Sequence, residues 1–425
     1  MIQTFKRIDK VKGVLKFQGD KSISHRALLI SSLADGKSII KNLSDNDDVK
    51  STIKCLNELG IEIFLNDEIC TVSGRGFRGY SKPNNKLDAG NSGTTARLLS
   101  GILSAQNFES VIVGDESLSS RPMKRILEPL TEMGAVIESN NGKLPLKIFP
   151  SEKLHSINYL LPVASAQVKS TILFAGLHLD EQTIIVERLQ TRNHTENLLD
   201  LAIVRESEKI ISRVSNRNYP NSKEYFIPGD ISSAMFFIVL ALLTKDSELM
   251  IKNISLNTTR TECLNILKKM GGDIHIKEIG VSNNEIFGDV IIKSAALSNV
   301  KINEEVIPLI IDEIPVLTIA GIFANGEFEL RGASELRLKE SDRIKAVCNN
   351  LLKVGLEVVE FEDGFRVSGS TKKLTEPFES YVDHRIAMAF AILSSLMKEG
   401  GEVNEFDCVS VSNPNFLEQL NSISA

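Results

Sequence analysis

The chain has 425 residues, which is more than one hydrophobic core usually holds, so its length predicts two domains. An apolar share of 42% and a charged share of 24% are typical of a globular protein. The formal net charge of −6 argues against a large nucleic-acid footprint. Trp is absent and only five Tyr are present, which weakens any interpretation based on stacking of sugars or bases.

The five cysteines are scattered, and none forms a Cys-x-x-Cys pair. Neither a disulfide framework nor a zinc site is therefore indicated. The first residues, MIQTFKRIDKVKG, lack an apolar signal stretch, and no apolar run approaches the length of a membrane span. We therefore expect a cytoplasmic protein without a membrane segment.

Six segments of the chain begin alike, with a small or charged residue, a polar loop and then an apolar helix. These openings lie roughly 65 to 85 residues apart. They begin at Gly19, Gly90, Ala164, Gly229, Asp312 and Asp383. A β-rich stretch, a polar loop and a second amphipathic helix follow each opening. Four of the second helices end in the same way, as CLNELG, LEPLTEMG, LNILKKMG and NLLKVG, which is an amphipathic pattern with a Gly stop.

The repeat unit is therefore β-α-β-α-β-β, and six copies cover nearly the whole chain. The third copy is degenerate, because LLDLAIVRESEKI lacks the Gly stop. The first helix of each unit is nearly apolar all round, as in SSAMFFIVLALLT, so it belongs in the middle of a domain with sheets packed outside it. Three units per domain predict two α/β domains, residues 20–227 and residues 1–19 together with 228–425.

The openings of the first three repeats place polar and cationic residues at helix N-termini, where free N–H groups and the helix dipole favour anions. In the first opening, Lys21, Ser22 and Arg26 lie close together, and the last two share a helix face. A capping serine with two solvated cations explains this segment equally well when it is taken alone. A nucleotide P-loop fits poorly, because GDKS has an Asp between Gly and Lys.

The second and third openings continue the anion-binding pattern. Asn91 and Gly93 leave a loop without bulk, in which backbone can approach an anion closely, and Arg121 follows in SLSSRPMKR. The third opening, SAQVKS, offers Ser165 and Gln167 in one helical turn. His194, further along in TRNHTE, is interpreted as structural.

The second half of the chain differs because its openings combine carboxylates with arginines. Asp312 begins the fifth helix, RLKESDR crowds Glu340 against Arg343, and Asp383 begins the DHR start of a strongly apolar helix. RLKESDR alone is compatible with an ordinary solvated helix start. A charge cluster directly before an apolar helix is harder to explain in that way. Together, the two halves suit chemistry in a cleft that closes around a polyanionic substrate.

Eight segments, in chain order, resemble motifs of the 5-enolpyruvylshikimate-3-phosphate (EPSP) synthase family: GDKSISHR, GNSGTTAR, RPMKR, SAQVKS, PGDISSA, IDEIP, LRLKESDR and DHRIAM. The resemblance covers essentially the full chain. It implies an inside-out α/β barrel fold in each of two domains. It also implies transfer of the enolpyruvyl group of phosphoenolpyruvate to the 5-hydroxyl of 3-phosphoshikimate in the shikimate pathway, without metal or other cofactor. A monomer with these small-molecule substrates, and with no nucleic-acid or membrane partner, is expected.

The resemblance further implies roles for individual residues. Contacts to 3-phosphoshikimate are expected from Lys21, Ser22, Arg26, Ser165, Ala166, Gln167, Thr191, Asp312 and Lys339. Contacts to phosphoenolpyruvate are expected from Lys21, Asn91, Gly93, Arg121, Gln167, Arg343, His384 and Arg385. Asp312, Glu340 and Lys21 form the expected catalytic set. Asp312 would accept the proton of the 5-hydroxyl and Glu340 would protonate the methylene carbon, although coupled carboxylates could exchange these two transfers.

Three positions depart from better-known family members. Ala166 stands where some members have a second serine, and Thr191 stands where some have Ser. Near the C-terminus, Val411 or Ser412 stands where some members use a lysine beside phosphoenolpyruvate. GDKS, SAQVK, RNHTE and NTTR resemble the glyphosate-tolerant branch of the family, whereas Gly93 leaves room where tolerant enzymes often have Ala. Glyphosate tolerance is therefore a hypothesis.

Two other classes of protein share features with this sequence. The UDP-N-acetylglucosamine enolpyruvyl transferases share the fold, but they have a KN pair near the N-terminus and a reactive Cys in a Gly-rich loop. The first motif here reads KSISHR, and no Cys lies in a Gly/Arg loop. A non-catalytic ring, such as a clamp around nucleic acid, would need a basic lining rather than an acidic chain with carboxylates in its loops.

Overall fold

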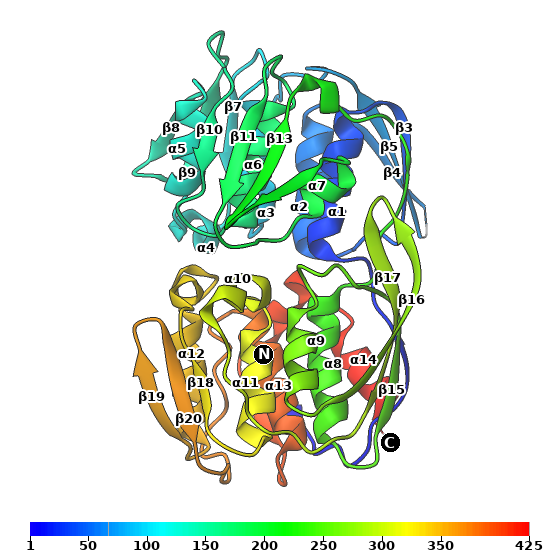
Figure 1. The fold of residues 1–425 in the computed structure, drawn as a ribbon, viewed down its shortest axis with the longest axis vertical. Coiled ribbons are helices and arrows are strands. Elements are labelled where there is room, and N and C mark those ends of the chain that lie inside the picture. Colours follow the sequence, from blue (N-terminus) through cyan, green and yellow to red (C-terminus); the bar gives the residue numbers. More distant parts are fainter. Residues whose placement is uncertain (67, 425) are drawn as a thin grey trace. The chain divides into compact units, whose positions relative to one another are not determined.

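The structure is a computed structural model that describes residues 1–66 and 68–424 (Figure 1). The chain divides into two compact units. Unit 1 comprises Met1–Phe17, Gly229–Gly280 and Ile286–Ala425, and unit 2 comprises Gln18–Pro228 and Val281–Glu285. The chain therefore crosses from one unit to the other after residues 17, 228, 280 and 285.

Unit 2 contains three four-stranded sheets of the same topology. Their strand orders are β14-β3-β5-β4, β6-β7-β9-β8 and β10-β11-β13-β12. In each sheet the first strand pairs parallel with the second, and the other pairs are antiparallel. The strands are β3 (Asp35–Lys41), β4 (Glu62–Asn66), β5 (Ile69–Arg75), β6 (Leu87–Asp88), β7 (Ser110–Val113), β8 (Val136–Asn140), β9 (Lys143–Phe149), β10 (Asn158–Leu160), β11 (Thr183–Glu187), β12 (Ile203–Glu206), β13 (Lys209–Val214) and β14 (Glu224–Phe226).

Three nearly fully buried helices form the core of unit 2: α1 (Lys21–Leu33), α3 (Gly93–Leu103) and α6 (Ala166–Gly176). Beyond their polar first turns, their apolar side chains are buried in the core of the unit, and only an interior position removes them from water. Helices α3 and α6 pack closely because Gly101 has no side chain; a Cβ there would lie 2.2 Å from the carbonyl oxygen of Thr171. Figure 1 shows these helices with the strands of unit 2 around them.

The second helices of the repeats in unit 2 vary in length. They are α2 (Asp47–Glu58), α4 (Glu116–Ser120) with α5 (Lys124–Glu132), and α7 (His194–Leu198). A 3₁₀ turn, η1 (Asn216–Asn218), follows β13. Helix α7 has five residues and belongs to the repeat whose sequence lacks the Gly stop. The degeneracy of the third repeat thus corresponds to a shortened helix.

Unit 1 has a four-stranded sheet of order β16-β17-β15-β2, a three-stranded sheet of order β18-β20-β19 and the pair β1-β21. None of the sheets in the described part of the chain closes into a barrel. The strands are β1 (Gln3–Phe5), β2 (Lys12–Lys16), β15 (Glu248–Ser255), β16 (Asp273–Ser282), β17 (Glu285–Lys293), β18 (Phe328–Leu330), β19 (Glu357–Phe361), β20 (Gly364–Ser368) and β21 (Gly401–Val403).

The core of unit 1 is again built on three apolar helices, α8 (Ile231–Leu243), α11 (Ile314–Phe323) and α13 (His384–Leu396), which pack on one another. Around them lie α9 (Glu262–Lys269), α10 (Ile307–Ile310), α12 (Arg343–Lys353), α14 (Phe416–Ile423), η2 (Glu304–Val306), η3 (Ser334–Leu338) and η4 (Phe406–Val411). Among the described residues, no single helix is long and apolar enough to span a membrane. The bent pair Glu304–Ile310 and Ile314–Phe323 is long and apolar enough only when its two helices are taken together.

The residue before each of the six central helices is polar, and five of these residues cap the helix with a side-chain oxygen. The capping oxygens belong to Asp20, Ser92, Ser165, Asp230 and Asp383. The sixth, Glu313, makes no such bond. A capping oxygen satisfies one of the free N–H groups of the first turn and fixes where the helix begins. The loops that carry the polar motifs are therefore held at defined helix starts.

Candidate active site

In unit 2, the start of α1 holds the first group of cationic residues. Lys21 Nζ lies 3.0 Å from Asp48 Oδ2 at the start of α2. Arg26 is buried, and its guanidinium donates to Thr195 Oγ1 (2.7 Å), Ser170 Oγ (2.8 Å) and the carbonyl oxygen of Ser22 (2.9 Å). Burial lowers the pKa of Arg26 to about 10, so the side chain is still a cation at neutral pH.

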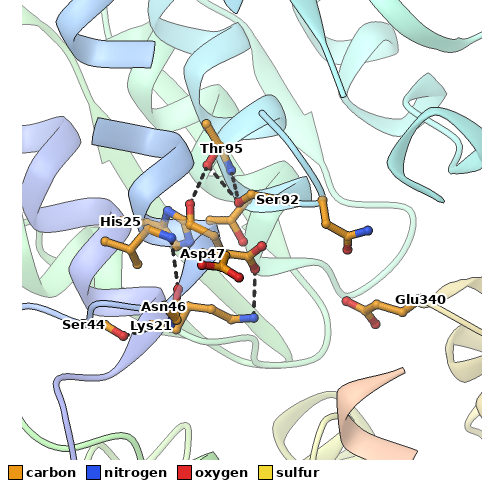
Figure 2. A network of polar contacts seen from close by, with 12 residues as sticks. Lys21, His25, Ser44, Asn46, Asp47, Ser92, Thr95 and Glu340 are labelled. Carbon is orange, nitrogen blue, oxygen red and sulfur yellow. Dashed lines mark hydrogen bonds and ion pairs between the residues drawn. The ribbon is translucent and has the colours of Figure 1, made fainter. Parts of the chain in front are cut away.

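A buried chain of one imidazole and several hydroxyl groups links α1, α2 and α3. His25 Nδ1 lies 2.7 Å from Thr52 Oγ1, which lies 2.7 Å from Thr95 Oγ1. Thr95 Oγ1 in turn donates to Ser92 Oγ over 2.8 Å (Figure 2). Burial, and to a lesser extent Lys21, lowers the pKa of His25 well below its ordinary value. His25 is therefore a neutral link that sets the position of Ser92 and of the loop before α3.

The second opening brings Asn91 and Arg121 into contact. Arg121 Nη2 donates to Asn91 Oδ1 over 2.7 Å and to Ser117 Oγ over 3.1 Å, and Asn91 Nδ2 donates to Asp115 Oδ2 over 2.8 Å. These contacts hold an arginine, predicted from the sequence to bind an anion, beside the start of α3.

Gly93 and Gln167 are joined by a residue that the sequence analysis did not select, Arg97. Arg97 Nη1 donates to Gln167 Oε1 over 2.6 Å, and Gln167 Nε2 donates to Thr94 Oγ1 over 3.0 Å. A Cβ on Gly93 would lie only 2.8 Å from Arg97 Nη1. The available signal was the helical spacing in GNSGTTAR, which places Arg97 four residues after Gly93.

A buried ion cluster supports the third opening. Lys169 Nζ lies 2.8 Å from Glu187 Oε2 and 2.7 Å from Glu196 Oε1, with all three side chains almost fully buried. Burial alone would lower the pKa of Lys169, but the two carboxylates outweigh it and raise that pKa. Thr191 donates to Glu187 Oε1 over 2.5 Å. The cluster therefore ties Thr191 to the helix that Ser165 caps and on which Ala166 lies.

In unit 1, the guanidinium of Arg343 brings together the predicted carboxylates. Its Nε and Nη2 atoms lie 2.8 and 3.2 Å from the two carboxylate oxygens of Asp383. Its Nη1 lies 3.2 Å from Asp312 Oδ1, and its Nη2 lies 2.6 Å from Glu340 Oε2. Lys339 Nζ lies 3.6 Å from Asp312 Oδ1. Two of the predicted catalytic residues, Asp312 and Glu340, therefore share one cation.

The partners of Arg343 differ in exposure. Side-chain exposure is 1% for Arg343 and 0% for Asp383, but 17% for Asp312 and 22% for Glu340. Burial alone would lower the pKa of Arg343, and the three carboxylates together raise it above its ordinary value. Asp383 is thus the buried anchor of a permanent cation, while Asp312 and Glu340 keep a solvent-accessible side.

Arg385 and His384 begin α13 immediately after Asp383. The backbone N–H of Arg385 donates to Asp383 Oδ1 over 2.9 Å, and both side chains are buried. Arg385 Nη1 makes no hydrogen bond to the described residues. A buried guanidinium with a donor to spare suits an anionic ligand, because leaving such a donor unsatisfied is unfavourable.

At the C-terminal position where a lysine was expected in some family members, Val411 ends η4 and Ser412 follows it. Ser412 is buried, and its hydroxyl has no hydrogen-bond partner among residues 1–66 and 68–424. Neither residue supplies a cation. Within the same residues, no group of three or more His, Cys, Asp or Glu side chains is arranged to hold a metal ion.

Solved structures of other proteins have the same fold as this chain. The enolpyruvyl transferase NikO from Streptomyces tendae superposes with a TM-score of 0.71 over 99% of this chain and 97% of its own, at 14% sequence identity. At that identity the likeness shows the fold alone, which is a mixed α/β fold. An EPSP synthase from Acinetobacter baumannii superposes with a TM-score of 0.85 at 36% identity, covering 100% of this chain and 98% of that one.

Sequence comparison identifies the family. A family model described as EPSP synthase (3-phosphoshikimate 1-carboxyvinyltransferase) matches residues 5–420. The 3-phosphoshikimate 1-carboxyvinyltransferases of Petrotoga mobilis and Salinibacter ruber are 44% and 41% identical over 422 and 428 residues, which cover 98% and 100% of both chains in each comparison. The chain therefore belongs to the EPSP synthase family, and the resemblance found in the sequence is confirmed.

We predict that Lys169→Met destabilises the protein, because two buried carboxylates would lose the lysine that pairs with both of them. Breaking a buried ion cluster in this way lowers the free energy of unfolding by about 3–5 kcal/mol. Equilibrium urea unfolding followed by circular dichroism measures the change. The matched control is Lys373→Met, which removes an equally short 2.8 Å ion pair with Glu399 at the surface. Equal effects of the two substitutions would contradict the prediction.

Proposed function

We propose that the chain transfers the enolpyruvyl group of phosphoenolpyruvate to the 5-hydroxyl of 3-phosphoshikimate by addition–elimination, with release of phosphate. Membership of the EPSP synthase family supports the overall reaction. The observation that carries the mechanism is the contact of one buried guanidinium, that of Arg343, with both Asp312 and Glu340. Two accessible carboxylates held beside one cation suit a reaction that needs two proton transfers.

In unit 2, we assign 3-phosphoshikimate to the residues at the starts of α1 and α6. The contacting residues are Lys21, Ser22, Arg26, Ser165, Ala166, Gln167 and Thr191, joined from unit 1 by Asp312 and Lys339. Each hydrogen bond from a charged group to a phosphate is worth about 1.5–3 kcal/mol. Arg26 is suited to this role, because three hydrogen bonds hold its guanidinium in place before any ligand arrives.

Phosphoenolpyruvate is assigned to arginines, because forked guanidinium groups match carboxylate and phosphate oxygens better than lysines do. Unit 2 contributes Lys21, Asn91, Gly93, Arg121 and Gln167, and unit 1 contributes Arg343, His384 and Arg385. The buried Nη1 donor of Arg385 supports this assignment. Arg97 supports this group indirectly, because its hydrogen bond to Gln167 holds that side chain in position.

The proposed chemistry follows from these positions. Asp312 takes the proton of the 5-hydroxyl while the oxygen bonds to C2 of phosphoenolpyruvate, and Glu340 gives a proton to C3. In the elimination, Glu340, now a carboxylate, takes a proton from the new methyl group, Asp312 passes its proton to the departing phosphate, and the C2–O bond to phosphate breaks as the double bond is restored. Lys21 assists as a cation beside the developing charge. No electrons are exchanged with another molecule, and Asp312 and Glu340 together give and take every proton that moves.

The structural part of the proposal is that each unit is an inside-out α/β barrel of three repeats. In this assignment, residues 20–227 mainly bind 3-phosphoshikimate, and residues 1–19 with 228–425 carry the catalytic carboxylates and the phosphoenolpyruvate arginines. The buried central helices support the arrangement. We also propose that the protein works as a cytoplasmic monomer.

The activity is tested by phosphate release from phosphoenolpyruvate, with and without 3-phosphoshikimate, in the presence of EDTA. We expect release that requires 3-phosphoshikimate and survives chelation. Release with UDP-N-acetylglucosamine in its place would overturn the acceptor assignment. Absence of release with both acceptors, together with no shift in melting temperature on adding either substrate, would overturn the enzymatic proposal.

Asp312→Asn and Glu340→Gln test the two carboxylates, since both changes keep the volume of the side chain and remove its proton chemistry. Each is expected to lower kcat by a factor on the order of 10² to 10⁴. Glu360→Gln is the control, because Glu360 pairs with Arg337 at the surface of the same unit, and its kcat should stay within about twofold of the wild type. A kcat of Glu340→Gln equal to that of the control would remove Glu340 from the mechanism.

Glyphosate tolerance remains a hypothesis that rests on the motifs GDKS, SAQVK, RNHTE and NTTR. We expect the purified enzyme to keep its phosphate-release activity at low micromolar glyphosate. Inhibition in that range would contradict the hypothesis.

The variant Gly93→Ala tests the space beside the proposed phosphoenolpyruvate site. Its Cβ would lie 2.8 Å from Arg97 Nη1, so Arg97 must shift and the KM for phosphoenolpyruvate should rise.

A further inference from the structure

Helix α7 contacts Arg26, the cation to which the proposed function assigns the phosphate of 3-phosphoshikimate. Thr195, in its first turn, accepts a hydrogen bond of 2.7 Å from Arg26 Nε and lies 2.7 Å from Ser170 Oγ, the second partner of Arg26. The five residues of α7 are too few to form a stable helix unaided. Its orientation, and with it that of Arg26, must therefore come from tertiary contacts.

Part of that support comes from far along the chain. Residues 281–285, the tip of the β16–β17 hairpin, belong to unit 2, whereas the arms of the hairpin belong to unit 1. Glu285 at the tip is fully buried, and its Oε1 lies 2.8 Å from His194 Nδ1, at the first residue of α7. The same oxygen accepts a hydrogen bond of 3.1 Å from Asn197 Nδ2, one turn further along. One carboxylate therefore holds α7 at two points.

The backbone of the tip strengthens the same attachment. Asn197 Nδ2 also donates to the carbonyl oxygen of Asn284 over 3.2 Å, and Asn284 Nδ2 donates back to the carbonyl oxygen of Asn197 over 3.1 Å. The opposite side of the tip is attached elsewhere: Asn283 Nδ2 donates to the carbonyl oxygen of Glu224 on β14 over 3.0 Å. The contacts to α7 and the contact to β14 are thus made by different residues.

The charge of Glu285 also acts on Arg26. Burial lowers the pKa of Arg26, and the carboxylates of Glu196, Asp20 and Glu285 oppose that effect. Glu285 therefore lies near enough to the guanidinium to favour its charged form, in addition to its contacts with α7. A cation prepared in this way binds a phosphate without first having to be ordered.

We propose that Glu285 is a positioning residue for 3-phosphoshikimate: it orients α7 through His194 and Asn197, so that Thr195 holds the guanidinium of Arg26 ready for the phosphate. This inference rests on the proposed function, because it takes Arg26 as a ligand of the substrate phosphate. His194, interpreted from the sequence as structural, is the link between the hairpin tip and the binding loop.

The test is binding of 3-phosphoshikimate to the full chain by isothermal titration calorimetry. Glu285→Ala removes both contacts to α7 and is expected to raise the Kd about tenfold, or about 1.4 kcal/mol. Glu285→Gln keeps an acceptor oxygen and the side-chain volume, so its Kd should stay within about threefold of the wild type. In steady-state assays the KM for 3-phosphoshikimate should rise with the Kd, while kcat and the KM for phosphoenolpyruvate stay within about twofold.

The matched control is Asn283→Gly in the same tip. It removes the bond to Glu224, and glycine suits the backbone there because Asn283 has a positive φ of 50°. Its Kd should equal that of the wild type. His194→Gln should also weaken binding, and the double variant should bind no more weakly than Glu285→Ala alone, because the His194–Glu285 contact is already lost in that single variant.

Three results would overturn the inference. The first is a Glu285→Ala variant that binds 3-phosphoshikimate like the wild type. The second is an Asn283→Gly variant that binds as weakly as Glu285→Ala, which would indicate a general effect of the hairpin. The third, which applies even if Glu285→Ala does not fold, is a fully folded Glu285→Gln as weak as His194→Gln. A wild type that does not bind 3-phosphoshikimate would instead overturn the proposed function.

Discussion

The pairing of Arg343 with Asp383 is the interaction on which the carboxylate cluster of unit 1 depends. A buried guanidinium is tolerated only when it is paired, and here both oxygens of a fully buried carboxylate accept from it. Arg343 begins α12, and Asp383 caps α13, so the ion pair fixes two helix starts together. Its remaining donors then hold Asp312 and Glu340 in place.

A second arginine of the same unit occupies a comparable place in the preceding repeat. Arg260 lies 3.7 Å from Glu313, the residue before α11, and 3.8 Å from Asp230, the cap of α8. Ser232 donates to Glu313 and accepts from Arg260. Two successive repeats therefore link an arginine to the carboxylate that begins the next central helix. In unit 2, serines take two of the three corresponding cap positions, so these two helix starts have no capping carboxylate.

Much of the architecture was predictable because it is local in sequence. Apolar helices with polar openings recur at regular intervals, so the six repeats and the degenerate third repeat follow from short segments, whereas the serine considered as the cap of the first helix is displaced by Asp20. The family motifs lie in the same segments. Glu340 lies three residues before Arg343, so that contact is local in sequence. Asp312 also contacts Arg343 because the starts of α11 and α12 come together in the fold.

The supporting contacts were not predictable, because they join residues that no local pattern connects. Lys169 meets Glu187 and Glu196 across a strand and a loop, and Glu285 meets His194 across 91 residues. A sequence shows each of these residues as an ordinary charge in a loop or helix. Only the packing of the chain decides which charges are buried together, and a buried charge must find its partner wherever the fold supplies one.

Running the reaction in D₂O tests most directly the claim that a carboxyl group beside Arg343, proposed to be that of Glu340, delivers a proton to C3 of phosphoenolpyruvate. Addition then delivers a deuteron to C3, and elimination removes one of three hydrogens from the methyl group. We predict that mass and NMR spectra of the enolpyruvyl product show deuterium in its methylene group. A product formed in D₂O with no deuterium at that carbon would contradict the account, because the methyl intermediate would never have existed.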